Sequence, residues 1–310
     1  MHKTLLSTGI AALLAVAANA SLAADAPKIP PIPQAEPPGQ LGEMVRLGRE
    51  LMQHTDTNPL TKAFVGNKLN CSSCHIDAGT TSTVGTFIGS ATAFPAWSGR
   101  EGVVESLQDR IANCFMRSMN GMRPPVDGKA VTAMTTYMTW LSEGQAIKQN
   151  PVKPVTPFFA NQWPDKALPP LLKKATHANY VAGEKVYAAR CASCHGADGL
   201  GQTGFPPLWG PDSYNAGAGM SKPVQMGTWV EQNMPLGNPD LTLQEVADVS
   251  LYVDAQKRPE FDVREHLPAK AIETGYYNAA NVDDIETVKG NLKSLGLDLD
   301  VIRGDKAAAH

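Results

Sequence analysis

The chain has 310 residues, of which 43% are hydrophobic and 18% are charged, and its formal net charge at pH 7 is −3. This length suits one to three domains, each with a core of its own. The nearly balanced charge offers no basic excess for binding nucleic acid or a membrane surface.

The N-terminus has the features of a secretory signal peptide, which we place at residues 1–24. Lys3 supplies the positive charge, residues 10–18 form a short apolar run, and small residues between Ala20 and Ala24 offer cleavage sites. The run is too short to cross a bilayer, and no other stretch is apolar enough. We therefore predict an exported protein without a membrane span in its mature form, most simply in a bacterial periplasm.

Proline-rich stretches divide the rest of the chain. Residues 25–40 predict an extended lead-in, and residues 149–170, with six prolines, predict a linker. The linker separates two domains, at 41–148 and 171–260. Residues 261–310 have a weak helical pattern and no assigned role, and we expect a surface-packed or partly disordered extension there.

The first domain is predicted to begin and end with helices. Between them come the motif CSSCH (71–75), the turn FPAWSGR (94–100) and a further helix over 103–118. The helices carry apolar stripes at helical spacing: Leu41, Met44, Leu47 and Leu51; Val104, Leu107, Ile111 and Phe115; Val131, Met134, Met138 and Leu141.

The second domain repeats this order, which indicates an internal repeat. A helical pattern over 181–187 precedes CASCH (191–195), and FPPLWGP (205–211) follows. Thr242 and Glu245 form a capping box before the last helix. Because no run of alternating strands is visible, the predicted fold class is mainly α.

The two Cys-x-x-Cys-His motifs predict two covalently attached c-type haems. Their thiols would form thioethers with the haem: Cys71 and Cys74 in the first motif, and Cys191 and Cys194 in the second. His75 and His195 would then be the proximal iron ligands. A zinc site usually has its CxxC pairs close in sequence, and a thioredoxin-like motif lies near a βαβ pattern, so both alternatives are disfavoured.

The second half resembles class I cytochrome c in GEKVYAARCASCHGADGLG and in the NMPLG loop (233–237). This resemblance implies that Met234 is the distal ligand of the second haem. A thioether ligand stabilises ferrous iron and suits electron transfer. Met220 is the competing ligand, and either methionine could instead merely pack against the haem.

Cys114 is the cysteine left over from the five after haem attachment. On the predicted helix, Arg110, Cys114 and Arg117 share a face, and Arg100 and Arg123 bracket the segment. Cations favour the thiolate form, which is both nucleophile and metal ligand, and guanidinium groups bind oxyanions. Met119 and Met122 leave ordinary His/Met ligation open, as they do an inert buried cysteine beside a solvated arginine face.

Residues 41–260 resemble the thiosulfate dehydrogenase (TsdA) family of dihaem cytochromes c. The resemblance lies in GNKLNCSSCH (66–75), FPAWSGREGVVESLQDRIANCFMRSMNG (94–121) and WVEQNMPLG (229–237). It implies that Cys114 is the distal ligand and reactive sulfur at the first haem. It also implies that Arg100, Arg110 and Ser118 hold the sulfur oxyanion. Some members have a competing lysine before the distal methionine, where this chain has Asn233.

The resemblance further implies that two thiosulfate anions are joined into tetrathionate, or the reverse, as a thiosulfate dehydrogenase or tetrathionate reductase. The second haem, with His195 and Met234, would pass electrons to an external partner such as a small cytochrome c. The alternatives are a dihaem electron carrier without sulfur chemistry and a SoxA-like sulfur-oxidation cytochrome. Nothing in the sequence points to the open peroxide site of a dihaem peroxidase.

Overall fold

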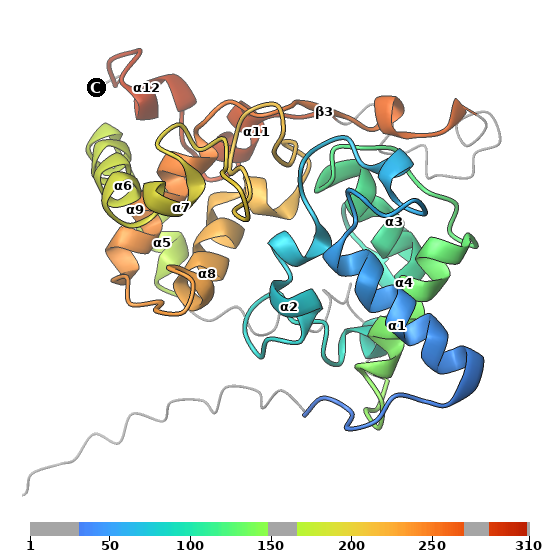
Figure 1. The fold of residues 1–310 in the computed structure, drawn as a ribbon. Coiled ribbons are helices and arrows are strands. Elements are labelled where there is room, and N and C mark those ends of the chain that lie inside the picture. Colours follow the sequence, from blue (N-terminus) through green and yellow to red (C-terminus); the bar gives the residue numbers. More distant parts are fainter. Residues whose placement is uncertain (1–30, 148–165, 270–284, 309–310) are drawn as a thin grey trace, which may run out of the picture.

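The computed structural model describes residues 31–147, 166–269 and 285–308. The predicted signal peptide and residues 149–165 of the predicted linker lie outside these ranges. Figure 1 shows two helical lobes side by side, which we call the N-terminal lobe (31–147) and the C-terminal lobe (166–260). The remaining residues, 261–269 and 285–308, run across both lobes and are called the C-terminal extension.

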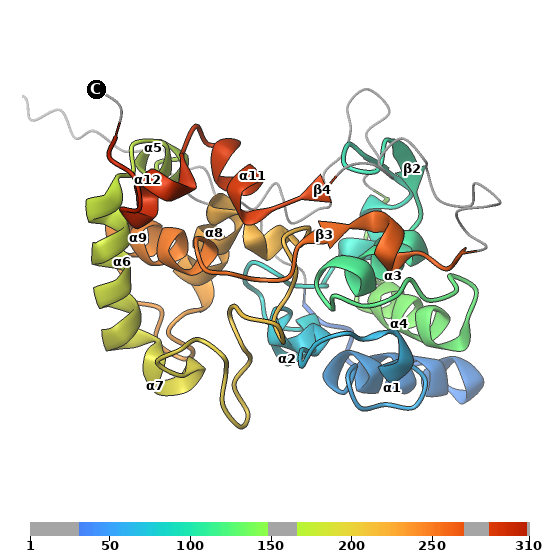
Figure 2. The same cartoon turned by 90° about the horizontal axis from the view of Figure 1, so that it is seen from above.

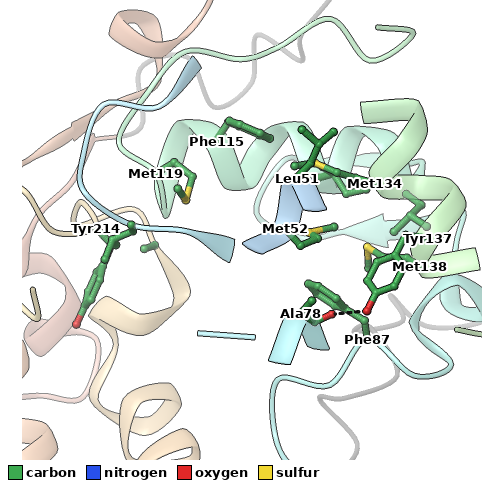
Figure 3. Packing of buried hydrophobic residues seen from close by; sticks show 14 of the residues in the cluster. Leu51, Met52, Ala78, Phe87, Phe115, Met119, Met134, Tyr137, Met138 and Tyr214 are labelled. Carbon is green, nitrogen blue, oxygen red and sulfur yellow. Dashed lines mark hydrogen bonds between the residues drawn. The ribbon is translucent and has the colours of Figure 1, made fainter. Parts of the chain in front are cut away.

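The N-terminal lobe is built around the packing of α1 (Gly39–Gln53) against α4 (Lys129–Trp140). The apolar stripe predicted for α4 is fully buried, which explains why this segment forms a helix on the core. Tyr137 of α4 reaches across the core, and its hydroxyl donates a hydrogen bond to the carbonyl of Ala78 at 3.1 Å (Figure 3).

A glycine lets α1 and α4 approach closely. A Cβ atom on Gly48 would lie 2.2 Å from the carbonyl oxygen of Ala133 and 2.6 Å from the Cβ of Tyr137. The C-terminal lobe has a matching close helix contact at a glycine, because a Cβ on Gly183 would lie 2.0 Å from the carbonyl oxygen of Asp248. The internal repeat therefore extends from the sequence motifs to the helix contacts.

Gly48→Ala should lower the stability of the N-terminal lobe by about 1–3 kcal/mol, since a clash with backbone forces the helices apart. Thermal unfolding of the holoprotein followed by circular dichroism measures the effect. Gly219→Ala is the matched control, because a Cβ there meets nothing within 4 Å. Equal melting temperatures for the two variants would contradict the close-packing role of Gly48.

The prediction of one helix over 103–118 is wrong at its start. Val103–Glu105 form strand β2, which pairs antiparallel with β1 (Ala96–Ser98). Val104 fits the helical stripe but is 67% exposed and lies opposite Trp97. Ser106 then caps α3 (Leu107–Arg117) through a capping box with Asp109. The cap and the β-branched pair before it place the helix start at Leu107.

In the C-terminal lobe, α6 (His177–Arg190) packs against α9 (Leu243–Asp254). The predicted capping box is present, since the Thr242 hydroxyl accepts a hydrogen bond from the backbone N–H of Glu245. Helix α5 begins inside the predicted linker, at Leu168. The other elements of the two lobes are α2 (Ile76–Gly79), α5 (Leu168–Lys173), α7 (Ala192–His195), α8 (Pro223–Asn233), and the 3-10 helices η1 (Lys62–Phe64), η2 (Cys71–Ser73), η3 (Ser90–Ala93) and η5 (Gly219–Ser221).

The C-terminal extension contacts both lobes (Figure 2). Its elements are β3 (Phe261–Asp262), η6 (Val263–His266), β4 (Ile285–Glu286), α11 (Val288–Lys293) and α12 (Leu299–Arg303). Strands β3 and β4 pair antiparallel. Helices α11 and α12 share a core with α5 and α9.

The predicted mainly α class is confirmed, because the described residues hold only short two-stranded sheets beside their helices. None of the helices in these described ranges is both long and apolar enough to cross a bilayer.

Candidate active site

A pocket opens in the N-terminal lobe between α3 and the first cysteine motif. Its walls are mainly apolar, with Phe87, Phe115 and Met138 among the side chains that Figure 3 draws. Cys71, Cys74 and His75 line one part of it, and Arg110, Cys114 and Ser118 line another. The chain therefore places the predicted haem-attachment residues and the odd cysteine in one cavity.

The attachment cysteines are held as neutral thiols. Asn70 and Ser73 cap η2, and the backbone N–H of Cys71 donates to the Thr55 hydroxyl at 3.0 Å. Burial raises the pKa of Cys71 and of Cys74 to about 12.

His75 is oriented as a metal ligand. Its Nδ1 lies 2.7 Å from the carbonyl oxygen of Gly85, so Nδ1 must carry the hydrogen and Nε2 is left for iron. The ring stacks on Phe87 with 4.1 Å between centroids. Burial, with a smaller contribution from Arg110, lowers the pKa of His75 to about 4, which keeps the imidazole in its ligating neutral form.

The second motif repeats this arrangement in the C-terminal lobe. Nδ1 of His195 lies 2.9 Å from the carbonyl oxygen of Pro206, which again leaves Nε2 for a metal. Met234 directly follows α8, and its backbone N–H bonds to the carbonyl of Val230. Both donor sets, two thiols and an imidazole bonded through Nδ1, fit a covalently attached haem.

The methionine alternatives separate in the structure. Met220, the sequence competitor of Met234, lines the first pocket. Met119 is 2% exposed and also lines the first pocket, so it is the rival of Cys114 there. Met122 is 36% exposed and is not part of the pocket wall.

Arg100 lies behind the pocket wall, while Arg110 and Ser118 are part of the wall. Nη1 of Arg100 donates to the carbonyl of Gly217 at 3.2 Å, and Nε of Arg100 lies 3.4 Å from a carboxylate oxygen of Glu101. Burial, then repulsion from Arg117 and Arg110, lowers the pKa of Arg100 to about 10. Arg100 and Arg110 therefore belong to one positive cluster.

The prediction that Arg117 and Arg123 face the same niche is wrong. Arg117 is 4% exposed and pairs with Glu101 at 3.2 Å, and Arg123 pairs with Asp109 at 2.6 Å. Neither side chain lines the pocket. The helical spacing is right, but long-range carboxylate partners draw these two guanidinium groups into buried ion pairs.

Tyr214 and Met220 complete the first pocket from the C-terminal lobe. Neither residue was predicted from the sequence to line this pocket. No local pattern could have shown it, because both residues lie about a hundred positions after α3 in the sequence.

Comparison with known proteins matches both lobes to cytochromes. A family model described as the SoxA/TsdA cytochrome c domain matches residues 61–147, and one for cytochrome c matches residues 180–257. The chain is 35% identical over 271 residues to a thiosulfate dehydrogenase of Thiomonas intermedia, covering 80% of this chain and 82% of that protein. It is 38% identical over 236 residues to a thiosulfate dehydrogenase of Allochromatium vinosum, covering 73% and 82%.

A solved structure agrees with these relatives. The thiosulfate dehydrogenase (TsdBA) from Marichromatium purpuratum superposes with a TM-score of 0.62 at 33% identity. The match covers 83% of this chain and 54% of that one, so the chain spans about half the length of the TsdBA chain.

Proposed function

Since the chain belongs to the thiosulfate dehydrogenase family of dihaem c-type cytochromes, we propose that it joins two thiosulfate anions into tetrathionate. The two electrons released pass to an external acceptor such as a small cytochrome c, and the same site can run the reaction in reverse. The family and the predicted signal peptide together support a periplasmic location.

The observation that carries this proposal is the shared pocket of Cys114, Arg110 and the first haem-attachment motif. A plain electron carrier does not need a cysteine and an arginine in the pocket that would hold its haem. Cationic side chains offset the repulsion between two dianions brought to one site. A thiolate provides the nucleophile for making and breaking sulfur–sulfur bonds.

The chemistry balances in two steps at Cys114. The thiolate and the terminal sulfur of one thiosulfate form a sulfur–sulfur bond with loss of two electrons, giving a Cys114 S-thiosulfonate. The terminal sulfur of a second thiosulfate then attacks the adduct sulfur that is bonded to the cysteine sulfur, and breakage of that bond releases tetrathionate and restores the thiolate. Arg110 and Ser118 lie where they can hold the sulfonate oxygens during both steps.

Cys71, Cys74, His75 and Cys114 would hold the first haem, and Cys191, Cys194, His195 and Met234 would hold the second. When bound, each haem c supplies a one-electron acceptor, so the pair matches a two-electron oxidation. The neutral imidazoles and the apolar first pocket fit this assignment.

Helix α8 of the C-terminal lobe is hydrogen-bonded to the part of the N-terminal lobe that carries the first cysteine motif. The indole N–H of Trp229 donates to the carbonyl of Cys74 at 2.8 Å. Asn233, directly before Met234, accepts from the Thr83 hydroxyl at 2.7 Å and donates to the carbonyl of Val84 at 3.2 Å. The buried Asn233 amide is thus hydrogen-bonded to the N-terminal lobe and to the Trp229 carbonyl of its own helix, which leaves Met234 without competition from a lysine at the preceding position.

Met234→His should lower the reduction potential of the second haem by roughly 0.1–0.3 V, because imidazole stabilises ferrous iron less than a thioether does. Potentiometric titration of the haem absorption bands measures the change. Met122→Leu is the matched control and should leave both potentials unchanged. A second-haem potential that stays at its wild-type value in Met234→His would remove Met234 as the ligand.

The proposed activity is tested with purified holoprotein in both directions. Thiosulfate oxidation should reduce an external acceptor with two electrons per tetrathionate formed, and tetrathionate should accept electrons from a reduced donor. Electron exchange with a small cytochrome but no turnover of either sulfur compound would instead indicate a carrier. Turnover only with a separate protein-bound sulfur substrate would indicate SoxA-like chemistry.

A further inference from the structure

The C-terminal extension packs directly behind the helix that carries Cys114. Phe261, Val263 and Leu267 form a small core with Met116 of α3. Figure 2 shows β3 and the following turn beside α3. The backbone N–H of Arg123 donates to the carbonyl of His266 at 2.9 Å. The extension thus supports both α3 and the loop that follows it.

The same extension holds the C-terminal loop that closes the pocket. The Asn291 amide donates to the carbonyl of Ala216 and to the Ser221 hydroxyl, both at 2.9 Å. These two residues flank Met220, which lines the pocket. The extension therefore contacts, in both lobes, residues that neighbour the pocket wall in sequence: Met116 directly follows a wall residue of α3, and Ser221 follows Met220.

Arg117 lies at the centre of these contacts. Its guanidinium carbon lies 4.2 Å from the ring centroid of Phe261, and its Nη1 lies 3.3 Å from the carbonyl oxygen of Gly217 and 3.6 Å from a carboxylate oxygen of Glu286. A Cβ on Gly217 would lie 2.6 Å from the Phe261 ring and 3.0 Å from Nη1 of Arg117. The packing leaves this arginine little freedom to move.

Glu286 is the carboxylate that the extension adds to the cluster. The same oxygen that faces Arg117 lies 3.9 Å from Nζ of Lys222. Arg100 shares the Gly217 carbonyl with Arg117 and also interacts with Glu286 and Arg110. Charges at this depth are poorly screened by salt, so each one contributes to the potential at the pocket.

The charged groups facing this cluster come from several elements. The cations are Arg100, Arg110, Arg117 and Lys222, and the carboxylates are Glu101, Glu105 and Glu286. Both Glu101 and Glu105 belong to the N-terminal lobe: Glu101 lies in the turn between β1 and β2, and Glu105 is the last residue of β2. Glu286 is the member that the extension contributes, so the extension controls one negative charge near the anion-binding pocket.

We propose that Glu286 is a positioning residue for the first haem site: it holds Arg117 behind Cys114 and weakens the positive potential that attracts anionic substrate. The C-terminal extension thereby sets the affinity of the pocket for dianions. A weaker positive potential at the pocket lowers its affinity for dianions. It therefore also favours release of the dianionic product. The identity of the substrate rests on the proposed thiosulfate chemistry.

The test is Glu286→Gln in the holoprotein, which removes the charge and keeps the shape of the side chain. Sulfate, an unreactive dianion, should bind several-fold more tightly than in the wild type when measured by calorimetry. The KM for thiosulfate should fall by a similar factor, and the reduction potential of the first haem should rise. A residue with only a structural role would not shift these quantities in this direction.

Two further variants separate charge from packing. Glu265→Gln removes a carboxylate from an exposed position in the same extension and should leave sulfate affinity unchanged. Glu286→Asp keeps the charge and should restore wild-type affinity. The proposal is overturned if Glu286→Gln binds sulfate as the wild type does, if Glu265→Gln shows the same gain, or if Glu286→Asp behaves like Glu286→Gln.

The proposed activity and the proposed role of Glu286 are tested by separate measurements. Sulfate binding is measured without turnover, so a wild-type protein that does not oxidise thiosulfate would remove the proposed function and leave the charge test intact. A wild type that oxidises thiosulfate, with unaltered sulfate affinity in Glu286→Gln, would remove the role of Glu286 alone.

Discussion

In Cys114→Ala, thiosulfate-dependent reduction of an external acceptor should fall by at least about 10³-fold while both haems stay attached. The variant removes the sulfur that forms the adduct and the proposed distal ligand of the first iron. Attachment is spared because it depends on the other four cysteines. Pyridine haemochrome spectra measure haem content, and steady-state assays measure turnover.

The helix should tolerate this change. Cys114 lies inside α3, and alanine has the highest helix propensity, so the cap at Ser106 and the packing of Phe115 should persist. Cys114→Gly should lose the same activity but cost about 1 kcal/mol more in helix stability. Agreement between the two variants in turnover would assign the loss to the thiol and not to the backbone.

Met119→Leu provides the matched control for ligation. Met119 lines the same pocket and is the remaining thioether that could reach the first iron. If Cys114 is the ligand, the spectrum of the first haem changes in Cys114→Ala and stays unchanged in Met119→Leu. Wild-type turnover in Cys114→Ala, or a spectral change confined to Met119→Leu, would reduce the proposed sulfur chemistry to simple electron relay.

The local motifs of this chain were readable from the sequence. A CxxCH motif fixes a short turn and its adjacent histidine, so the attachment residues need no tertiary information. The apolar stripe of α4 and the capping box at Thr242 depend on neighbours within a few residues, and both are present in the structure. The placement of Cys114 on a helix facing a pocket followed from the same local periodicity.

Long-range contacts account for the sequence-based predictions that were wrong. Val104 matched a helical stripe, but its pairing with Trp97 across the hairpin makes it part of a strand. Arg117 matched the face of Cys114, but it pairs with Glu101, 16 residues away, and with Glu286 from the far end of the chain. The charge around the pocket is therefore a tertiary property, and counting arginines in one segment overestimates it.

Arg110 is the arginine whose loss should weaken anion use most. Arg117 and Arg123 are buried in ion pairs, and Arg100 donates to the Gly217 carbonyl behind the pocket wall. Arg110 lines the pocket itself, beside Cys114. A hydrogen bond to a charged group contributes about 1.5–3 kcal/mol, so Arg110→Gln should lower kcat/KM for thiosulfate roughly ten- to hundredfold.

The geometry of the guanidinium group distinguishes oxyanion binding by Arg110 from a simple charge effect. A planar fork can bind two oxygens of one sulfonate group, whereas an ammonium acts as a point charge. Arg110→Lys should therefore recover only part of the loss, and haem content should stay at the wild-type level in both variants. Arg46→Gln removes an equal charge from an exposed position on α1 and should leave kcat/KM unchanged. Full recovery by lysine would show that charge alone is needed, and wild-type kinetics in Arg110→Gln would contradict oxyanion binding by Arg110.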